Sequence, residues 1–332
     1  MSFYRIVAFQ NIKSMKKIII FILFFQFGLA KERDSIALLN PFAKYHVQLE
    51  KFDFCDACGC SASGGSMGFA SMLNSDFVGI RYFNQSYKSN DGLYTNSPWY
   101  NEDFNTIQAW ARIPVLKKMQ LSVLVPYHFH NRERLEGKQT ISGLGDITVL
   151  GMYPLYQTEK DSAFFSHTLQ MGVGVKMPTG EFKQANAGAV NPSFQVGTGS
   201  LDYLFAAEYV IKRKQLGLNA MLNYVVKTEN EKLYRFGNQI NYAGTFFYLI
   251  ETPKYIVVPQ LGFAGEKYDD NYQYGQKVRN TAGDIFFGKL GFEIGRDQFS
   301  FGANAMLPNN QNLTGGNVKA NYRLSVNLNY SL

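Results

Sequence analysis

The sequence predicts an all-β fold, a transmembrane antiparallel up-and-down β-barrel of about 12 strands. Composition is the first reason: the 332-residue chain is 46% hydrophobic, with 28 Phe, 21 Tyr and 30 Gly, yet its mean hydropathy is only -0.18. The second reason is that residues 76–332 consist of segments of about 10 alternating residues separated by polar turns. Thirdly, the connections between these segments are alternately short and long, as in barrels with tight periplasmic turns and longer extracellular loops.

Residues 1–30 are predicted to be a signal peptide. The apolar run at 18–27 follows a pair of lysines and precedes a Gly-Leu-Ala sequence, which supplies small residues for cleavage. Because a membrane-spanning helix needs about 20 apolar residues, this run is too short to be an anchor. Met15, directly before the lysines, is an alternative translation start. Removing the four basic residues of this segment leaves 29 basic against 26 acidic residues, so the charge gives no support for nucleic-acid binding.

A segment at 31–75, periplasmic or plug-like, is expected between the signal peptide and the barrel. It holds the three cysteines of the chain, Cys55, Cys58 and Cys60. Thiolates at this spacing can converge on one soft ion such as copper(I), or on zinc. In an oxidising compartment, a disulfide with one remaining thiol explains the same residues without a metal. Both alternatives stay open, as does an intermolecular or inert role.

Two faces alternate along each predicted strand, an apolar one toward lipid and a polar one toward the lumen. This alternation is clearest at 120–130, 168–177 and 323–332. The lumen-lining candidates taken from it are Gln120, Ser122, His128, His130, Thr168, Gln170 and Lys176. The predicted strands are 76–84, 104–115, 119–130, 145–156, 164–177, 197–211, 215–226, 237–250, 255–266, 282–294, 299–308 and 321–332. Since proline lacks an N–H group, four prolines in or near these strands are expected to mark strand ends or bulges, namely Pro114, Pro126, Pro154 and Pro259.

The histidines are the residues most able to carry chemistry. His128 and His130 are two apart on a strand, so they point to the same face and could share a metal. A polar network lining the barrel is the more ordinary explanation of such residues. Ser166 and His167 do not occur in the spacing of a hydrolase triad, so the sequence predicts no catalytic residue and no enzyme.

Three short segments carry a resemblance to a known family: Gly-Leu-Gly-Asp at 143–146, Lys-Met-Pro-Thr-Gly at 176–180 and Gly-Thr-Gly-Ser-Leu-Asp at 197–202. They resemble the outer-membrane barrels named for the MetA pathway of phenol degradation, in a Bacteroidetes-like variant with an N-terminal cysteine motif. The resemblance implies a transporter. Judged by their residue types alone, the three segments form turns and mark where strands begin or end. None of their residues is proposed as a ligand contact.

These observations together favour an outer-membrane channel or transporter for a small solute of hydrophobic or aromatic character. The alternatives are a copper-handling outer-membrane protein that uses the cysteine segment, and a closed structural barrel. The expected partners are outer-membrane lipid, the barrel-assembly machinery and the solute, with no nucleic acid. No cofactor is expected other than the copper or zinc considered for the cysteines.

Overall fold

The computed structural model describes most of the chain after residue 70. The described residues are 71–90, 97–116, 118–134, 137–158, 164–182, 185–186, 189–190 and 194–332. The predicted signal peptide and the three cysteines lie outside them. In the described part, no helix is long and apolar enough to cross a membrane.

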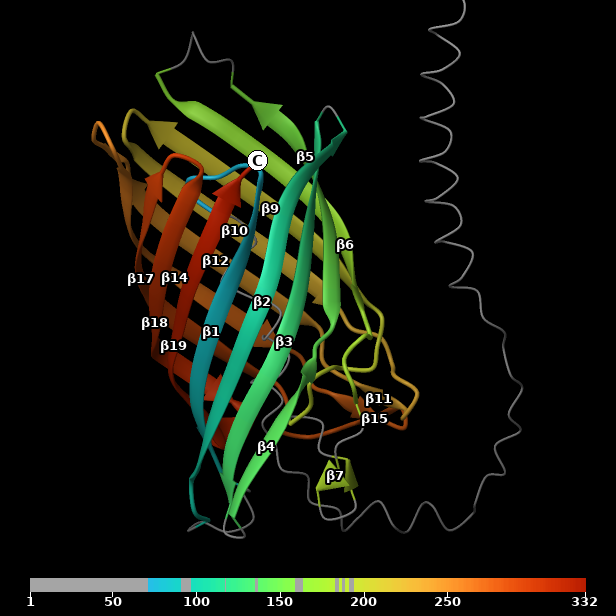
Figure 1. Cartoon of the computed structure of the whole chain (residues 1–332). Coiled ribbons are helices and arrows are strands. Elements are labelled where there is room, and N and C mark those ends of the chain that lie inside the picture. Colours follow the sequence, from blue (N-terminus) through green and yellow to red (C-terminus); the bar gives the residue numbers. More distant parts are fainter. Residues whose placement is uncertain are drawn as a thin grey trace, which may run out of the picture. The chain divides into compact units, whose positions relative to one another are not determined.

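The protein is a closed antiparallel barrel (Figure 1). One sheet of 14 strands holds β4 and β13, which extend the wall locally, and the twelve strands that close the ring. The twelve are β1 (Phe77–Ser89), β2 (Tyr100–Leu116), β3 (Met119–Arg134), β5 (Ile147–Gln157), β6 (Ser166–Met177), β9 (Asp202–Arg213), β10 (Leu216–Val226), β12 (Gln239–Tyr248), β14 (Ile256–Tyr268), β17 (Gly283–Arg296), β18 (Phe299–Leu313) and β19 (Val318–Ser331). Each pairs with the next in chain order, and β1 pairs with β19 to close the ring. The predicted twelve-stranded barrel is confirmed.

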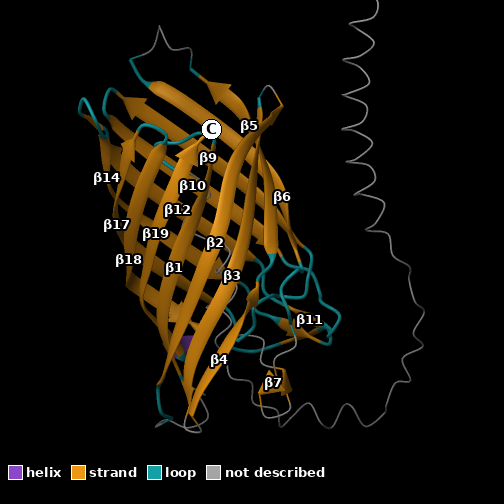
Figure 2. Cartoon of the chain, in the orientation of Figure 1, coloured by secondary structure: helices purple, strands orange, loops and turns teal. Residues whose placement is uncertain are grey.

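Short elements complete the chain. Strand β4 (Gly137–Leu144) pairs with β3 and continues the line of β5 across a break at Gly145 and Asp146. The others are β7 (Ala185–Asn186), β8 (Ala189–Val190), β11 (Tyr234–Arg235), β13 (Ile250–Glu251), β15 (Tyr272–Gln273), β16 (Gln276–Lys277) and the 3-10 turn η3 (Thr314–Gly316). Figure 2 shows that strands make up most of the described chain, with loops gathered at one end of the barrel.

The two ends of the barrel differ as the sequence predicts. The five connections that the sequence predicts to be short lie at one end, which we call the turn end, together with the C-terminus (Figure 1). Two of them join strands through only two residues and use a positive φ, 52° at Lys214 and 52° at Asp297. The long connections lie at the opposite end, the loop end, which is the extracellular side in barrels of this kind. The long connection predicted between residues 308 and 321 is wrong: β18 and β19 extend toward each other, and only residues 314–317 separate them.

Several strands run further toward the loop end than the alternation indicates. The first predicted strand stops at residue 84, whereas β1 continues to Ser89. In this extension both faces carry polar residues, because the wall has left the hydrocarbon and no longer needs an apolar outer face. The alternation of apolar and polar residues therefore ends before the backbone pairing between strands does.

Burial follows the predicted two faces. In β3, Ser122 and His128 are 1% and 4% exposed, whereas Tyr127 between them is 49% exposed. Val173 on β6 and Leu290 on β17 are each 64% exposed. Apolar side chains thus point outward to lipid and polar ones inward, the reverse of a soluble protein.

The four prolines lie where the ladder is interrupted. Pro114 and Pro154 are each followed by a shift in register, while Pro126 accepts from Gly145 N at the break between β4 and β5. Pro259 lies just past the last pair of β12 with β14. The missing N–H of each proline therefore falls at an irregularity, as expected.

Candidate functional site

The inner face of the barrel surrounds a central cavity of about 60 Å³. A single water needs only about 10–15 Å³ of such volume, so the space exceeds what one water fills. Strands from all sides of the barrel contribute to it, and so do Ser71 and Met72, which precede β1.

One wall of the lumen is apolar. Phe77 and Trp110 meet edge to face with ring centroids 4.5 Å apart. They belong to a single buried cluster whose other members are Leu124, Leu150, Met152, Leu204 and Val225. Trp110, Leu150 and Met152 of this cluster line the cavity. An aqueous pore has no need of such a surface, whereas an apolar solute does.

Five charged side chains also line the cavity. Arg112 Nη2 lies 3.3 Å from Glu208 Oε2, and Asn219 Nδ2 donates to the other oxygen of Glu208 over 2.7 Å. Arg81 lies between two rings, with its guanidinium carbon 4.3 Å from the ring centroids of both Phe83 and Trp110. Cation–π contacts of this kind hold a guanidinium in a fixed place within the lumen.

The chain before β1 lies inside the barrel at the turn end. Ser71 Oγ bonds a carboxylate oxygen of Glu293, and Met72 N donates to the other oxygen over 2.9 Å. Asn74 Nδ2 donates to Ser300 Oγ over 2.8 Å. The last residues of the predicted plug-like segment therefore narrow the lumen from this side. The plug role of the rest of residues 31–75 stays a prediction.

Aromatic and aliphatic side chains fill the lumen at the loop end. This loop-end cluster consists of Tyr87, Phe104, Phe194, Ala264, Tyr268, Ile285, Phe287, Met306, Leu313, Val318 and Ala320, none more than 7% exposed. A buried ion pair crosses it: Arg323 donates from Nη1 to Glu266 Oε1 over 2.7 Å and from Nη2 to Oε2 over 2.9 Å. Arg323 also donates to Tyr87 Oη, and Tyr268 Oη bonds Glu266. Packing and charge thus close this level of the barrel.

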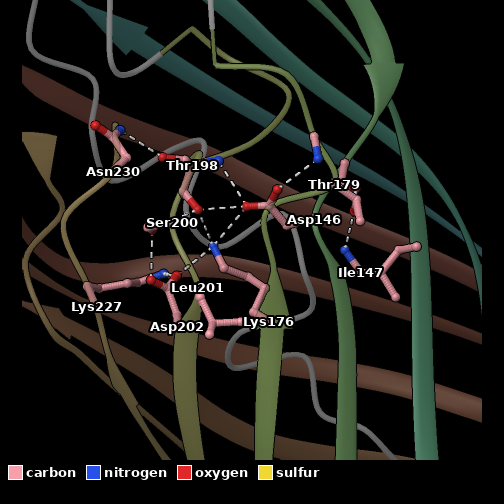
Figure 3. Close-up of polar contacts among 12 residues, drawn as sticks. Asp146, Ile147, Lys176, Thr179, Thr198, Ser200, Leu201, Asp202, Lys227 and Asn230 are labelled. Carbon is pink, nitrogen blue, oxygen red and sulfur yellow. Dashed lines mark hydrogen bonds and ion pairs between the residues drawn. The ribbon is translucent and has the colours of Figure 1, made fainter. Parts of the chain in front are cut away.

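The three segments that carry the family resemblance meet in one buried polar network (Figure 3). Asp146 accepts from Gly180 N over 3.0 Å and from Thr198 N over 2.9 Å. Lys176 Nζ lies 3.1 Å from Asp146 and 2.8 Å from Asp202. Lys227 Nζ lies 3.1 Å from the same Asp202 oxygen. The network holds the loop after β6 onto the ends of four strands, so its residues act together rather than as separate turn signals.

The structure distributes the sequence-predicted lumen residues over several levels. At the turn end, Gln120 Nε2 donates to Asp76 Oδ1 over 2.8 Å, and Thr168 pairs with Gln157 on the neighbouring strand. Gln170 and Ser122 lie further along the wall, while Lys176 belongs to the network of Figure 3. They therefore do not form one site.

The histidine pair lies in the lumen toward the loop end. The ring centroids of His128 and His130 are 4.8 Å apart, and His128 Nδ1 is 2.8 Å from Thr106 Oγ1. His130 packs on Phe104 with centroids 4.9 Å apart. The described residues contain no group of three or more His, Cys, Asp or Glu side chains that could hold a metal. A shared metal stays a prediction that rests on two imidazoles.

Sequence reasoning missed Trp110, Arg81 and Lys289 as cavity residues. Lys289 Nζ donates to Thr245 Oγ1 over 3.2 Å, and both residues line the cavity. Strand β17 carries Ile285 and Phe287 on the same inward face as Lys289. With apolar residues on both faces, its alternation gave no clear lumen side.

Comparison with known proteins gives one family and several barrels. Residues 117–324 match the model of the family described as "Putative MetA-pathway of phenol degradation". Among solved structures, the chain is similar to the COG4313 outer membrane channel from Pseudomonas putida F1, with a TM-score of 0.60 and 13% identity over 79% of this chain and 97% of that chain. It is more distantly similar to a FadL homologue from Pseudomonas aeruginosa, with a TM-score of 0.36 and 9% identity over 85% and 99% of the two chains. A search of curated proteins gives no match.

Proposed function

The chain belongs to the outer-membrane barrel family named for the MetA pathway of phenol degradation, and we propose that it is a channel for a small apolar or aromatic solute. The observation that carries the proposal is the apolar wall of Trp110, Leu150 and Met152 beside the central cavity. Ligand sites are concave and mostly apolar, with a few polar groups that fix orientation. The cavity combines such an apolar wall with a larger share of polar and charged groups.

The remaining space inside the ring favours a channel over a closed structural barrel. Barrels of about 8 strands fill their interiors with side chains, and those of 16 or more hold an aqueous channel. A ring of twelve strands is intermediate. Its lumen keeps a cavity between two narrowed levels, the loop-end cluster and residues 71–76. A solute that crosses must pass both of these closures, so slow, selective flux is expected.

Flux of two related sugars into liposomes tests this function. Glucose and phenyl glucoside both cross lipid slowly without a protein. An aqueous pore passes the smaller glucose faster, whereas an apolar lumen passes phenyl glucoside faster. Purified full-length protein is reconstituted and liposome swelling is recorded for each sugar. Faster swelling with phenyl glucoside supports the proposal, and no swelling with either sugar contradicts it.

A matched pair of variants ties the preference to the apolar wall. Met152→Gln places an amide on that wall and should abolish the preference for phenyl glucoside. Lys138→Gln introduces the same side chain at an exposed position of β4 and should leave the preference unchanged. If the two variants showed the same preference for phenyl glucoside, the apolar wall would not be the cause of that preference.

A further inference from the structure

The central cavity has hydrogen-bond donors without acceptors. Lys289 is 8% exposed, and its Nζ donates to Thr245 Oγ1 over 3.2 Å. No carboxylate of the described residues forms an ion pair with it. Trp110 Nε1 and Arg112 Nε are buried and have no hydrogen-bond partner. Residues of β2 and β17 that line one cavity thus carry donors with unused capacity.

The two carboxylates that line the cavity are already engaged. Glu208 accepts from Arg112 and Asn219. Glu293 accepts from Ser71, Met72 N and Ser300. Neither forms an ion pair with the ammonium of Lys289.

The cavity wall is therefore positive. Its charged residues are the cations Arg81, Arg112 and Lys289 and the anions Glu208 and Glu293, a balance of +1. An unpaired buried ammonium is unfavourable, and hydrogen bonds between charged donors and a carboxylate are about twice as strong as neutral ones. An anion that enters the cavity would relieve this imbalance.

An apolar surface lies beside these donors. Leu150, Met152 and Met221 line the same cavity, together with Ala206 and Ala243. They offer no hydrogen bond to a polar solute. A molecule that satisfies both parts of the wall has one anionic group and an apolar body.

We propose that the cavity binds a small hydrophobic carboxylate, with Lys289 and the Trp110 N–H facing its carboxylate and the Leu150–Met152 side facing its apolar body. This assignment rests on the proposed channel and names its solute class. The neutral aromatic solute of the channel proposal becomes the weaker ligand. Arg81 and Arg112 add positive charge without giving up their present contacts.

Calorimetric titration of the full-length protein in a non-ionic detergent tests the assignment. The probes are 4-methylbenzoate and the neutral 4-methylbenzyl alcohol, which have closely similar apolar bodies. The protein should bind the carboxylate at least tenfold more tightly than the alcohol. Lys289→Met should weaken carboxylate binding at least tenfold and leave alcohol binding unchanged.

Three variants serve as controls. Lys212→Met removes one lysine charge from an exposed position near the turn end and should bind as the unmodified protein does. Lys289→Arg keeps the charge and should keep the preference for the carboxylate. Trp110→Phe keeps a ring but removes the N–H, so the carboxylate should bind about threefold more weakly. If Lys289→Met does not fold, as judged by heat-dependent gel mobility, Lys289→Gln takes its place.

Each outcome separates this assignment from the channel. Equal binding of the two probes, or a carboxylate preference that survives Lys289→Met, would overturn the assignment. Phenyl glucoside flux without a carboxylate preference would overturn it and keep the channel. Lysine-dependent carboxylate binding without flux of any probe would keep the binding site and reject the channel.

Discussion

The two closures of the lumen are built differently. At the loop end, the Glu266–Arg323 pair and all the aromatic side chains except Phe194 belong to wall strands, each held by ladders on both sides. At the turn end, residues 71–76 belong to no strand and are held by side-chain contacts with Glu293, Ser300 and Gln120. Only the second closure can leave without breaking the wall, so the turn end is the end we expect to open.

The largest effect is expected from the loop-end ion pair. Glu266→Gln leaves the guanidinium of Arg323 buried without its carboxylate, which should lower the free energy of unfolding by about 3–5 kcal/mol. Urea unfolding in detergent micelles measures the loss. A loss below 1 kcal/mol would mean that the loop-end closure is as loosely held as the turn-end one.

The next largest effect tests which face of the barrel wall points to lipid and which to the lumen. Val173→Arg places a charge on the lipid side and should cost about 2–4 kcal/mol if the site is near the bilayer midplane. Ser122→Arg places the same side chain on the lumen side, opposite Arg112 of β2, where it faces protein rather than lipid and should cost less. Unfolding of both variants in lipid vesicles compares them. Equal destabilisation would contradict the assignment of the two faces.

Weakening the turn-end closure should lower the free energy of unfolding less than the two preceding substitutions do, but it should clearly raise solute flux. Glu293→Gln replaces bonds to a charged acceptor with neutral ones, which should weaken docking of residues 71–76 by about 1 kcal/mol, or about fivefold in the open fraction. Deletion of residues 31–75 should raise small-solute flux further. Single-channel conductance reads both changes. Unchanged conductance in the deletion variant would place the controlling closure at the loop end instead.

The smallest effect is expected at the cysteines, which lie outside the described residues. Three titratable thiols protected by copper(I) would support a metal site at Cys55, Cys58 and Cys60. A single titratable thiol without bound metal would support the disulfide. Neither result should change the stability of the barrel wall.

The sequence predicted the strands of the barrel wall better than the side-chain contacts inside the lumen. Strand number, faces and turn ends depend on a local period of two, so they can be read from neighbouring residues. The Glu266–Arg323 pair joins residues 57 positions apart, and the network of Asp146, Lys176 and Asp202 forms only when β5, β6 and β9 have paired. Charges at the loop ends of three strands were the available signal for that network. Lys289 stayed hidden because its strand is apolar on both faces.

Closure of the ring joins the two ends of the barrel sequence. Phe77 of β1 pairs with Ser331 of β19, and Leu332 N donates to Asp76 O over 3.2 Å. This seam, the pairing of β1 with β19, cannot form until β19 is present. Until then, two unpaired strand edges remain available for pairing with other chains. Contacts between residues so distant in sequence also form slowly. The seam therefore makes late assembly the moment at which this protein is most exposed to aggregation, before its lumen exists at all.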